Sequence, residues 1–198
     1  MISCFKGKFR LTSPRGDRVL NGVEGYHKGI DLVGVDDINV YSIADGVIDA
    51  TPYEASGFGY YVRMKLPDGR RIYYGHLKQG SIVVKAGQSV KKGDKLGVMG
   101  NTGHSFGAHT HLELRPAGTG KDSIDICEYT GIPNVKGTYT YVEEKKMLET
   151  ANDIAWELNH SYFPITDMPR FVKALEAARK ENSSLYWGYY KIVNGIKK

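Results

Sequence analysis

Two histidines, separated by one residue, begin the run HTHLELR at residues 109–115. Apolar residues alternate in this run, which predicts a β-strand. Side chains two residues apart in a strand point to the same face, so His109, His111 and Glu113 would share one side of it. Two neighbouring imidazoles can bind one metal ion, take part in one reaction or belong to a polar surface. The run alone does not decide between these three alternatives.

A second group of side chains with suitable chemistry lies in the segment YHKGIDL, residues 26–32. His27 and Asp31 are four residues apart, a spacing that places both on one face of an extended segment and equally of a helix. Gly29 and Ile30 favour the extended form. Two imidazoles and one carboxylate suit Zn²⁺, and three protein ligands leave the fourth tetrahedral position for water. His27, Asp31 and one histidine of the pair are therefore candidate ligands of a catalytic zinc.

Three segments in this order resemble the lysostaphin-like, LytM-type zinc metallopeptidases of family M23, which cleave peptides of bacterial peptidoglycan. They are HKGID (27–31), YYGHL (73–77) and HTHLE (109–113). A Gly-rich loop, GNTGHSFGAHTH (100–111), leads into the histidine pair as it does in that family. The resemblance covers about residues 9–115 and implies an antiparallel β domain with a substrate groove.

The resemblance also implies a role for each of five residues. His27, Asp31 and His111 would bind zinc, whereas His76 and His109 would be catalytic histidines that do not bind the metal. We assign to His109 the transfer of a proton from the attacking water to the leaving amine, and to His76 a hydrogen bond to the oxyanion. The reverse assignment fits the sequence equally well.

Three positions depart from the family pattern. Arg15 stands where an aromatic residue is usual, Ala108 where proline is usual and Thr110 where an apolar residue is commoner. None of these changes removes a metal ligand, so they bear on the groove and on the choice of substrate. His104, in the Gly-rich loop, is expected to face solvent. Glu113 is expected either to orient a ligand histidine or to pair with a basic residue.

The chain divides into two regions that differ in composition and periodicity, and the first of them contains the candidate site residues. Residues 1–142 are rich in glycine and in β-branched and aromatic residues, which predicts a mainly β, antiparallel domain. The resemblance implies that this is the M23-type metallopeptidase domain. Its clearest hairpin lies on either side of the turn residues Pro67-Asp68-Gly69. Residues 143–198 show helical periodicity, first between Leu148 and Tyr162, and predict a small helical C-terminal domain. Its aromatic residues would form a core or bind the cell wall, and its role is unknown.

Composition limits the classes of partner. The 198 residues are 41% hydrophobic, which is ordinary for a globular chain, and the formal net charge is +5. Basic residues are dispersed rather than clustered, so we expect no binding to nucleic acid. No apolar run approaches the roughly 20 residues of a membrane-spanning helix, so we expect no membrane insertion. Cys4 and Cys127 are far apart, which predicts two free thiols.

The N-terminal run MISCFKGKFRLTS mixes charged and apolar residues and lacks the apolar core of a signal peptide. We therefore expect a protein that is made in the cytoplasm without a signal peptide and acts at the bacterial cell wall, as a phage-type lysin does after release. The sequence does not indicate an oligomeric state.

Three functional hypotheses follow. The first is a zinc endopeptidase that cleaves stem peptides or cross-bridges of peptidoglycan. Glycine bridges, D-Ala to diaminopimelate links and stem-peptide bonds all remain open as the bond that is cut. The second is a non-catalytic LytM-like module that binds or regulates at the cell wall, although such relatives have lost ligands that are present here. The third is a carrier or sugar-phosphotransfer-like domain, because VKAGQSVKKGDKLG (84–97) resembles the turn repeats of lipoyl and related β folds.

Overall fold

The structure, a computed structural model, describes residues 1–20, 22–118 and 122–142. The helices expected over residues 143–198 lie outside the described residues, and the division into two domains at residue 142 stays a prediction. The described residues contain thirteen strands and one short helix. In chain order they are β1 (Gly7–Ser13), β2 (Gly16–Leu20), β3 (Val23–His27), β4 (Ile30–Gly34), β5 (Asn39–Tyr41), β6 (Gly46–Ala50), β7 (Tyr53–Glu54), β8 (Gly59–Lys65), β9 (Arg71–Leu77), β10 (Ser89–Val90), β11 (Lys95–Val98), β12 (Thr110–Arg115), α1 (Ile126–Thr130) and β13 (Gly137–Tyr141).

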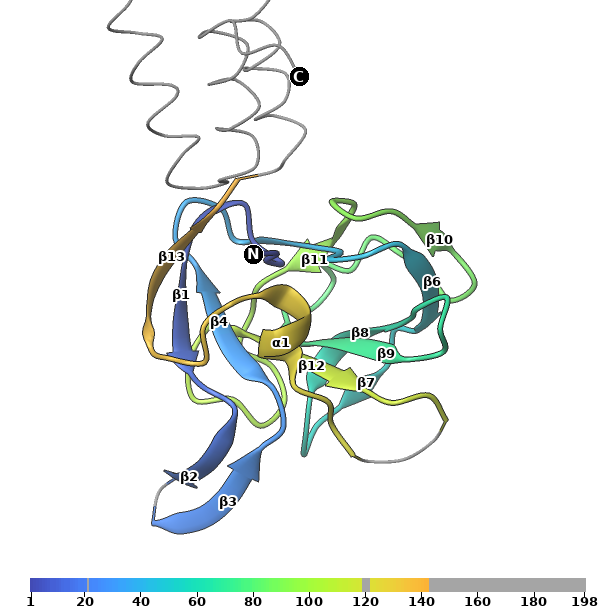
Figure 1. The fold of residues 1–198 in the computed structure, drawn as a ribbon. Coiled ribbons are helices and arrows are strands. Elements are labelled where there is room, and N and C mark those ends of the chain that lie inside the picture. The colour runs from blue at the N-terminus through green and yellow to red at the C-terminus, as the bar shows by residue number, and fades with distance from the viewer. Residues whose placement is uncertain (21, 119–121, 143–198) are drawn as a thin grey trace, which may run out of the picture. The chain divides into compact units, whose positions relative to one another are not determined.

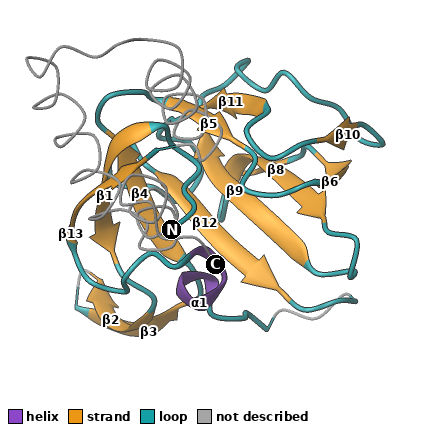
Figure 2. Cartoon of the chain, turned by 45° about the horizontal axis from the view of Figure 1, so that its top comes forward, coloured by secondary structure: helices purple, strands orange, loops and turns teal. Residues whose placement is uncertain are grey.

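Nine of these strands form one antiparallel sheet. Its order is β10-β6-β8-β9-β12-β4-β1-β13, and β7 pairs with β8 beside this path. Figure 2 shows β9, β12 and β4 running next to one another across the middle of the sheet. The mainly β, antiparallel fold predicted from the sequence is thus confirmed. The predicted hairpin is present as β8 and β9, and the turn is closed by a hydrogen bond from the Gly69 N–H to the Leu66 carbonyl (3.0 Å).

Strand β12 is central to the sheet because it pairs with β9 on one side and β4 on the other. Apolar and polar residues alternate along β12, so they point to opposite faces of the sheet. Leu112 and Leu114 are fully buried in the apolar core. His111 and Glu113 lie on the opposite face, where they are hydrogen-bonded to each other. Period-two patterning therefore places the polar residues of this strand together, as the sequence predicted.

Strands β2 and β3 form a separate two-stranded sheet (hereafter the β2–β3 hairpin), which projects from the body of the fold (Figure 1). Its register pairs Gly16 with His27 and Arg18 with Gly25. Residues at paired and alternate positions share a face, so Arg18 lies on the same face of the hairpin as His27. Most of β3 is exposed, and only His27, its last residue, is buried.

The sequence did not predict α1, since no helical periodicity was expected before residue 143. The helix has five residues, too few to show a periodic pattern. It is defined instead by its ends. The Asp125 side chain accepts a hydrogen bond from the Cys127 N–H, and Gly131 ends the helix in the left-handed conformation (φ 70°).

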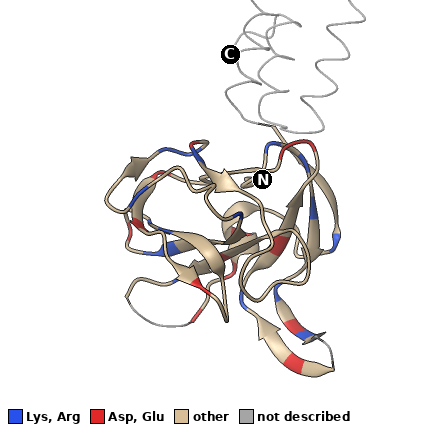
Figure 3. Ribbon diagram, turned by 180° about the vertical axis from the view of Figure 1, so that it is seen from behind, with Lys and Arg blue, Asp and Glu red and all other residues tan. Residues whose placement is uncertain are grey.

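Cys4 and Cys127 are buried free thiols, as expected. Within the described residues, no helix has both the length and the apolar character needed to cross a membrane. Lysines, arginines and acidic residues are dispersed over the coloured part of the ribbon in Figure 3.

One apolar cluster supports the large sheet, and Tyr74 of β9 is its largest fully buried side chain. Tyr74 is 0% exposed, and its hydroxyl accepts a hydrogen bond from the Ile43 N–H (3.0 Å). Burial raises the pKa of Tyr74 far above its usual range, so the hydroxyl stays neutral. The largest fully buried side chains are Tyr74, Phe5, Phe9, Leu11, Ile30, Leu32, Ile43, Ile48, Met64, Ile72, Leu77 and Leu96.

We expect Tyr74→Phe to lower the free energy of unfolding by about 1–3 kcal/mol, because the buried Ile43 N–H would lose its acceptor. Urea denaturation followed by circular dichroism measures this change. Tyr53→Phe is the matched control, since Tyr53 is 55% exposed and its replacement should change stability by less than about 0.5 kcal/mol. Equal stability of the two variants would contradict the expectation.

Candidate metal centre and active site

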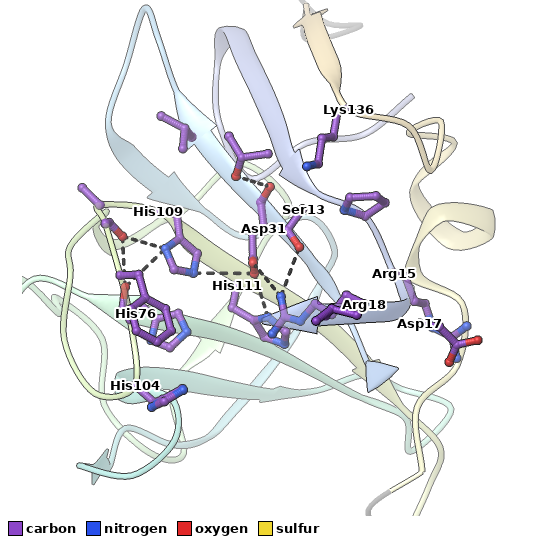
Figure 4. A pocket seen from close by; sticks show the side chains of 18 residues that line it. Ser13, Arg15, Asp17, Arg18, Asp31, His76, His104, His109, His111 and Lys136 are labelled. Carbon is purple, nitrogen blue, oxygen red and sulfur yellow. Dashed lines mark hydrogen bonds and ion pairs between the residues drawn. The ribbon is translucent and has the colours of Figure 1, made fainter. Parts of the chain in front are cut away.

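Three of the predicted residues bring potential ligand atoms together. His27 Nε2 lies 3.1 Å from Asp31 Oδ1 and 3.0 Å from His111 Nδ1, and His111 Nδ1 lies 3.0 Å from Asp31 Oδ1. Figure 4 shows Asp31 and His111 pointing into the same pocket. Among the described residues, this is the group of His, Cys, Asp and Glu side chains whose geometry suits a metal ion.

The sheet register produces this convergence. Asp31 of β4 is directly opposite His111 of β12. His27 ends β3, and only Lys28 and Gly29 separate it from β4, so this short connection carries the His27 imidazole to the same place. Gly29 in this connection has no room for a side chain. A Cβ there would lie 2.3 Å from the Leu112 carbonyl oxygen and 2.8 Å from His111 Nε2. The glycine of HKGID is therefore required by the close approach of the connection to β12.

In each candidate ligand histidine, the ring nitrogen that faces away from the metal centre is hydrogen-bonded to an acceptor. His27 Nδ1 lies 2.8 Å from the Pro14 carbonyl oxygen, so it carries the proton and leaves Nε2 free to bind a metal. His111 Nε2 lies 3.0 Å from Glu113 Oε2, which leaves Nδ1 for the metal. Glu113 is only 2% exposed and also accepts a hydrogen bond from Arg115 Nε (2.6 Å). Such hydrogen bonds fix the orientation of a metal-binding imidazole.

The electrostatics of the group favour a cation. Burial opposes the charge on Asp31, but hydrogen bonds with His111 and His27 outweigh it and hold the pKa of Asp31 far below its usual range. Burial also opposes the charge on Glu113, and hydrogen bonds with His111 and Arg115 lower its pKa. Burial opposes a charged His111, yet the hydrogen bonds to both carboxylates raise its pKa to about 9. The negative potential that retains a proton on His111 also suits a metal ion, whose binding would displace that proton.

The residues present fit zinc. Tetrahedral zinc binds nitrogen and oxygen at about 2.0–2.2 Å, so its ligand atoms lie roughly 3.3 Å from one another. The three distances in the group are close to this value. Two imidazoles and one carboxylate are the ligand types that zinc accepts in catalytic sites. The ligand roles of His27, Asp31 and His111 remain a prediction that this geometry supports.

Two further histidines face the same pocket. The rings of His76 and His109 are 4.6 Å apart, and His109 Nε2 lies 3.6 Å from Asp31 Oδ1. His76 Nδ1 is 2.8 Å from the Thr102 carbonyl oxygen, and His109 Nδ1 is 2.7 Å from the Gly107 carbonyl oxygen. Both carbonyls belong to the Gly-rich loop, residues 100–108. In both neutral imidazoles the proton is therefore on Nδ1, and Nε2 presents a lone pair.

His76 also has an unusual backbone. Its φ is +59°, the one positive value at a non-glycine residue among those described. Its N–H donates to the Phe58 carbonyl (2.7 Å), which helps to hold this conformation. Burial lowers the pKa of His76 to about 4, although the hydrogen bond to Thr102 opposes the change. His76 is thus a neutral imidazole at neutral pH, in a backbone conformation of the kind that concentrates at functional sites.

Asp31, His76, His109 and His111 line a groove of about 620 Å³. Cationic residues in its lining are Arg15, Arg18 and Lys136, and His104 and Phe106 of the Gly-rich loop form part of its wall. His104 is exposed, as expected for a loop histidine, although it also borders the groove.

The structure brings together all five residues that the sequence singled out, and Glu113 is hydrogen-bonded both to a ligand histidine and to a basic residue, so its two expected roles coexist. Sequence reasoning missed Arg18, whose Nη1 contacts Ser13 Oγ at 3.1 Å and Asp31 Oδ2 at 3.5 Å. The dipeptide Asn21-Gly22 could have revealed it, because Asn-Gly is typical of a tight hairpin turn. A hairpin closed by this turn places Arg18 and His27 on the same face.

Comparison with known families gives a match that includes the site. The sequence pattern of peptidase family M23 matches residues 25–124, about half of the chain. This range contains His27, Asp31, His76, His109 and His111.

Three curated relatives are each 32% identical to the chain. An uncharacterized metalloprotease of Haemophilus influenzae matches over 142 residues, which are 70% of this chain and 29% of the relative. Endolysin 2638A of Staphylococcus phage 2638A matches over 143 residues, 70% of this chain and 28% of the relative. The peptidoglycan DD-endopeptidase ShyA of Vibrio cholerae matches over 152 residues, 72% and 33%. The chain therefore spans a third or less of the length of these relatives.

Solved structures with the same fold include M23 catalytic domains. The catalytic domain of lysostaphin from Staphylococcus simulans aligns with a TM-score of 0.55 and 27% identity over 62% of this chain and 92% of that one. The catalytic domain of the prophage-encoded M23 protein EnpA from Enterococcus faecalis aligns with a TM-score of 0.52 and 31% identity over 59% of this chain and 88% of that one. A zinc-containing peptidase from Vibrio cholerae aligns with a TM-score of 0.50 and 28% identity over 58% of this chain and 36% of that one.

We expect Glu113→Gln to weaken zinc binding about 10- to 100-fold, because an amide lacks the charge that orients and polarises His111. Competition against a chromophoric chelator measures the zinc affinity. Glu128→Gln, at an exposed position of α1, is the control and should bind zinc as the parent chain does. If both variants keep the parent affinity, Glu113 serves only as the partner of Arg115.

Proposed function

The chain belongs to peptidase family M23, and from this premise we propose that it is a zinc-dependent endopeptidase that hydrolyses peptide bonds in the stem peptides or cross-bridges of bacterial peptidoglycan. One observation carries the proposal. The ligand atoms of His27, Asp31 and His111 lie within 3.1 Å of one another, and two histidines outside this group face the same groove. A binding module without catalytic activity could use a metal site for its structure, but it would not need the two further histidines.

When bound, Zn²⁺ supplies Lewis-acid polarisation of the scissile carbonyl and makes water acidic enough to lose a proton near neutral pH. The residues of the chain supply the rest. His27, Asp31 and His111 would hold the ion, and the Pro14 carbonyl and Glu113 would keep the two imidazoles oriented. The groove would align an extended peptide across the site.

His109 is proposed to carry the proton. Its Nε2 bears a lone pair because Nδ1–H donates to the Gly107 carbonyl, and the Asp31 carboxylate, 3.6 Å away, would stabilise the imidazolium that forms. The proton would then pass from Nε2 to the leaving amine. This arrangement meets the geometric need for a general base whose other nitrogen is fixed by an acceptor.

His76 is proposed to assist at the oxyanion, under one condition that the sequence did not reveal. Because its Nδ1–H donates to the Thr102 carbonyl, neutral His76 offers an acceptor, not a donor, at Nε2. It can therefore stabilise an oxyanion only after it has gained a proton at Nε2. That proton would have to come from solvent, because the proton that His109 takes from the water passes to the leaving amine, and the lowered pKa of His76 opposes the protonation.

A role as a phage-type lysin is the finer part of the proposal. The similarity to an endolysin of a staphylococcal phage supports it, whereas the Vibrio cholerae relative supports only the peptidoglycan substrate. Since the chain spans a third or less of these proteins, its own substrate and setting are matters for experiment.

We expect His76→Ala and His109→Ala each to lower the rate of peptide cleavage about 10²- to 10⁴-fold while they keep one zinc ion per chain. Kinetics on solubilised peptidoglycan together with metal analysis test this. His27→Ala is the contrasting variant, because it should lose both zinc and activity. Full turnover by either the His76 or the His109 variant would contradict its catalytic role.

We expect digestion of purified peptidoglycan to release new free amines without new reducing ends. Mass analysis of the fragments from walls with glycine bridges and with direct D-Ala to diaminopimelate links identifies the bond. Chelation should abolish the reaction, and added zinc should restore it. New reducing ends would indicate a glycosidase and overturn the proposal. Folded chain that binds zinc but releases no amines from any wall would favour the non-catalytic alternative.

A further inference from the structure

Arg18 extends from the β2–β3 hairpin to the edge of the metal centre. Its Nη1 donates to Ser13 Oγ (3.1 Å) and lies 3.5 Å from Asp31 Oδ2, the carboxylate oxygen that does not face the histidines. Within the part of the chain that the structure describes, Nε and Nη2 of Arg18 have no hydrogen-bond partner. The side chain is 34% exposed. One edge of the guanidinium is therefore held by the protein, while the other is available to a ligand.

The hairpin gives this free edge room. Gly25, paired with Arg18 across the hairpin, has no side chain, and nothing lies within 4 Å of the position that a Cβ would take. A side cleft of about 400 Å³ runs between β3 and the tip of the Gly-rich loop, with Val23, Tyr26 and Phe106 in its walls. Arg18, His104 and Phe106 line both this cleft and the main groove. Arg18 thus lies where the two spaces meet.

The charge of the groove points to an anionic ligand. Its cationic residues are Arg15, Arg18 and Lys136, against the carboxylates of Asp17 and Asp31. Asp31 is already surrounded by histidines, and a bound divalent ion would make the region more positive. Arg15 is committed elsewhere, because its Nη2 donates to Ser123 and its guanidinium lies over the Tyr26 ring. Arg18 is the arginine whose free edge is nearest to the reacting position.

We propose that Arg18 binds a free carboxylate of the substrate peptide, on the carbon that carries the scissile nitrogen. This inference rests on the proposed function and names the substrate class within it. A guanidinium edge with two N–H donors matches a carboxylate in bidentate geometry. Diaminopimelate acylated on one amine carries a carboxylate on that same carbon, two bonds from the scissile nitrogen, whereas an internal glycine of a bridge carries none. The chain therefore prefers direct D-Ala to diaminopimelate links over glycine bridges.

The test uses two synthetic peptides that contain this link and differ in one group. One keeps the carboxylate beside the scissile nitrogen, and the other has a carboxamide there. The parent chain is expected to cleave the carboxylate peptide with a kcat/KM at least about tenfold higher, the range that charge-assisted hydrogen bonds give. In Arg18→Gln this ratio should fall to about one, and Arg18→Lys should retain part of it because it keeps the charge but not the fork.

Arg70→Gln is the matched control. Arg70 is 33% exposed, similar to Arg18, and pairs with Asp68 in the turn between β8 and β9, so the ratio should stay at the parent value. If Arg18→Gln slows both peptides by the same factor and leaves the ratio unchanged, Arg18 only positions Asp31 and the proposal is wrong. Zinc affinity, measured by chelator competition, separates these cases. Kinetics at saturating zinc remove any effect of Arg18→Gln on zinc affinity that arises from its 3.5 Å contact with Asp31, and a ratio that stays at the parent value there overturns the proposal.

A binding measurement separates this inference from the proposed function. Calorimetry with the two peptides on zinc-loaded His109→Ala, with and without Arg18→Gln, reports the carboxylate preference without turnover. Preferential binding that Arg18→Gln abolishes supports the carboxylate site even if the parent chain cleaves neither peptide, in which case the proposed function fails alone. Equal binding of the two peptides to the Arg18-containing protein overturns the carboxylate site, whatever the result for cleavage.

Discussion

The site depends on one largely buried carboxylate, Asp31, whose side chain is 13% exposed and lies among imidazoles. Its Oδ1 lies within 3.6 Å of a nitrogen of His27, His111 and His109, and its Oδ2 faces Arg18. A buried charge without partners would be strongly destabilising, so the fold has to keep proton-donating or cationic groups on every side of it. The pairing of β4 with β12, which sets His111 opposite Asp31, is therefore part of the sheet and of the site at once. A cation bound in this group would take over the partnership that His111 and His27 provide in its absence.

The four histidines of the site follow one rule. Each has one ring nitrogen bound from behind to an acceptor, which fixes the nitrogen that faces the pocket. For His27 and His111 the acceptors are the Pro14 carbonyl and Glu113. For His76 and His109 both acceptors are carbonyls of the Gly-rich loop, residues 100–108. A single loop therefore sets the protonation pattern of both proposed catalytic groups, and a change in its conformation would affect them together. The positive φ of His76 is a further cost that this arrangement carries.

The sequence predicted the parts of this protein that depend on local pattern. Alternation placed His111 and Glu113 on one face of β12, and the residues Pro67-Asp68-Gly69 predicted the hairpin of β8 and β9. The choice of His111 rather than His109 as the partner of His27 came from resemblance, since His27 and His111 are 84 residues apart and only the sheet order brings them together. The tautomers of His76 and His109 depend on main-chain carbonyls, which any sequence has, so no residue type could indicate them. The five-residue helix α1 was missed because it is defined by Asp125 and Gly131 at its ends rather than by a pattern.

Arg15 shows how a departure from the family pattern can be accommodated by packing. It stands where an aromatic residue is usual, and its guanidinium lies 5.1 Å from the centre of the Tyr26 ring. Its Nη2 also donates to the carbonyl and hydroxyl of Ser123, and its backbone N–H donates to Asn134 Oδ1. The flat guanidinium thus packs against an aromatic ring and ties the base of the β2–β3 hairpin to the segments on either side of α1. These contacts leave Arg15 little freedom to meet a ligand. Two arginines three residues apart therefore differ in function because of their neighbours, one fixing the hairpin and the other presenting a free edge to the groove.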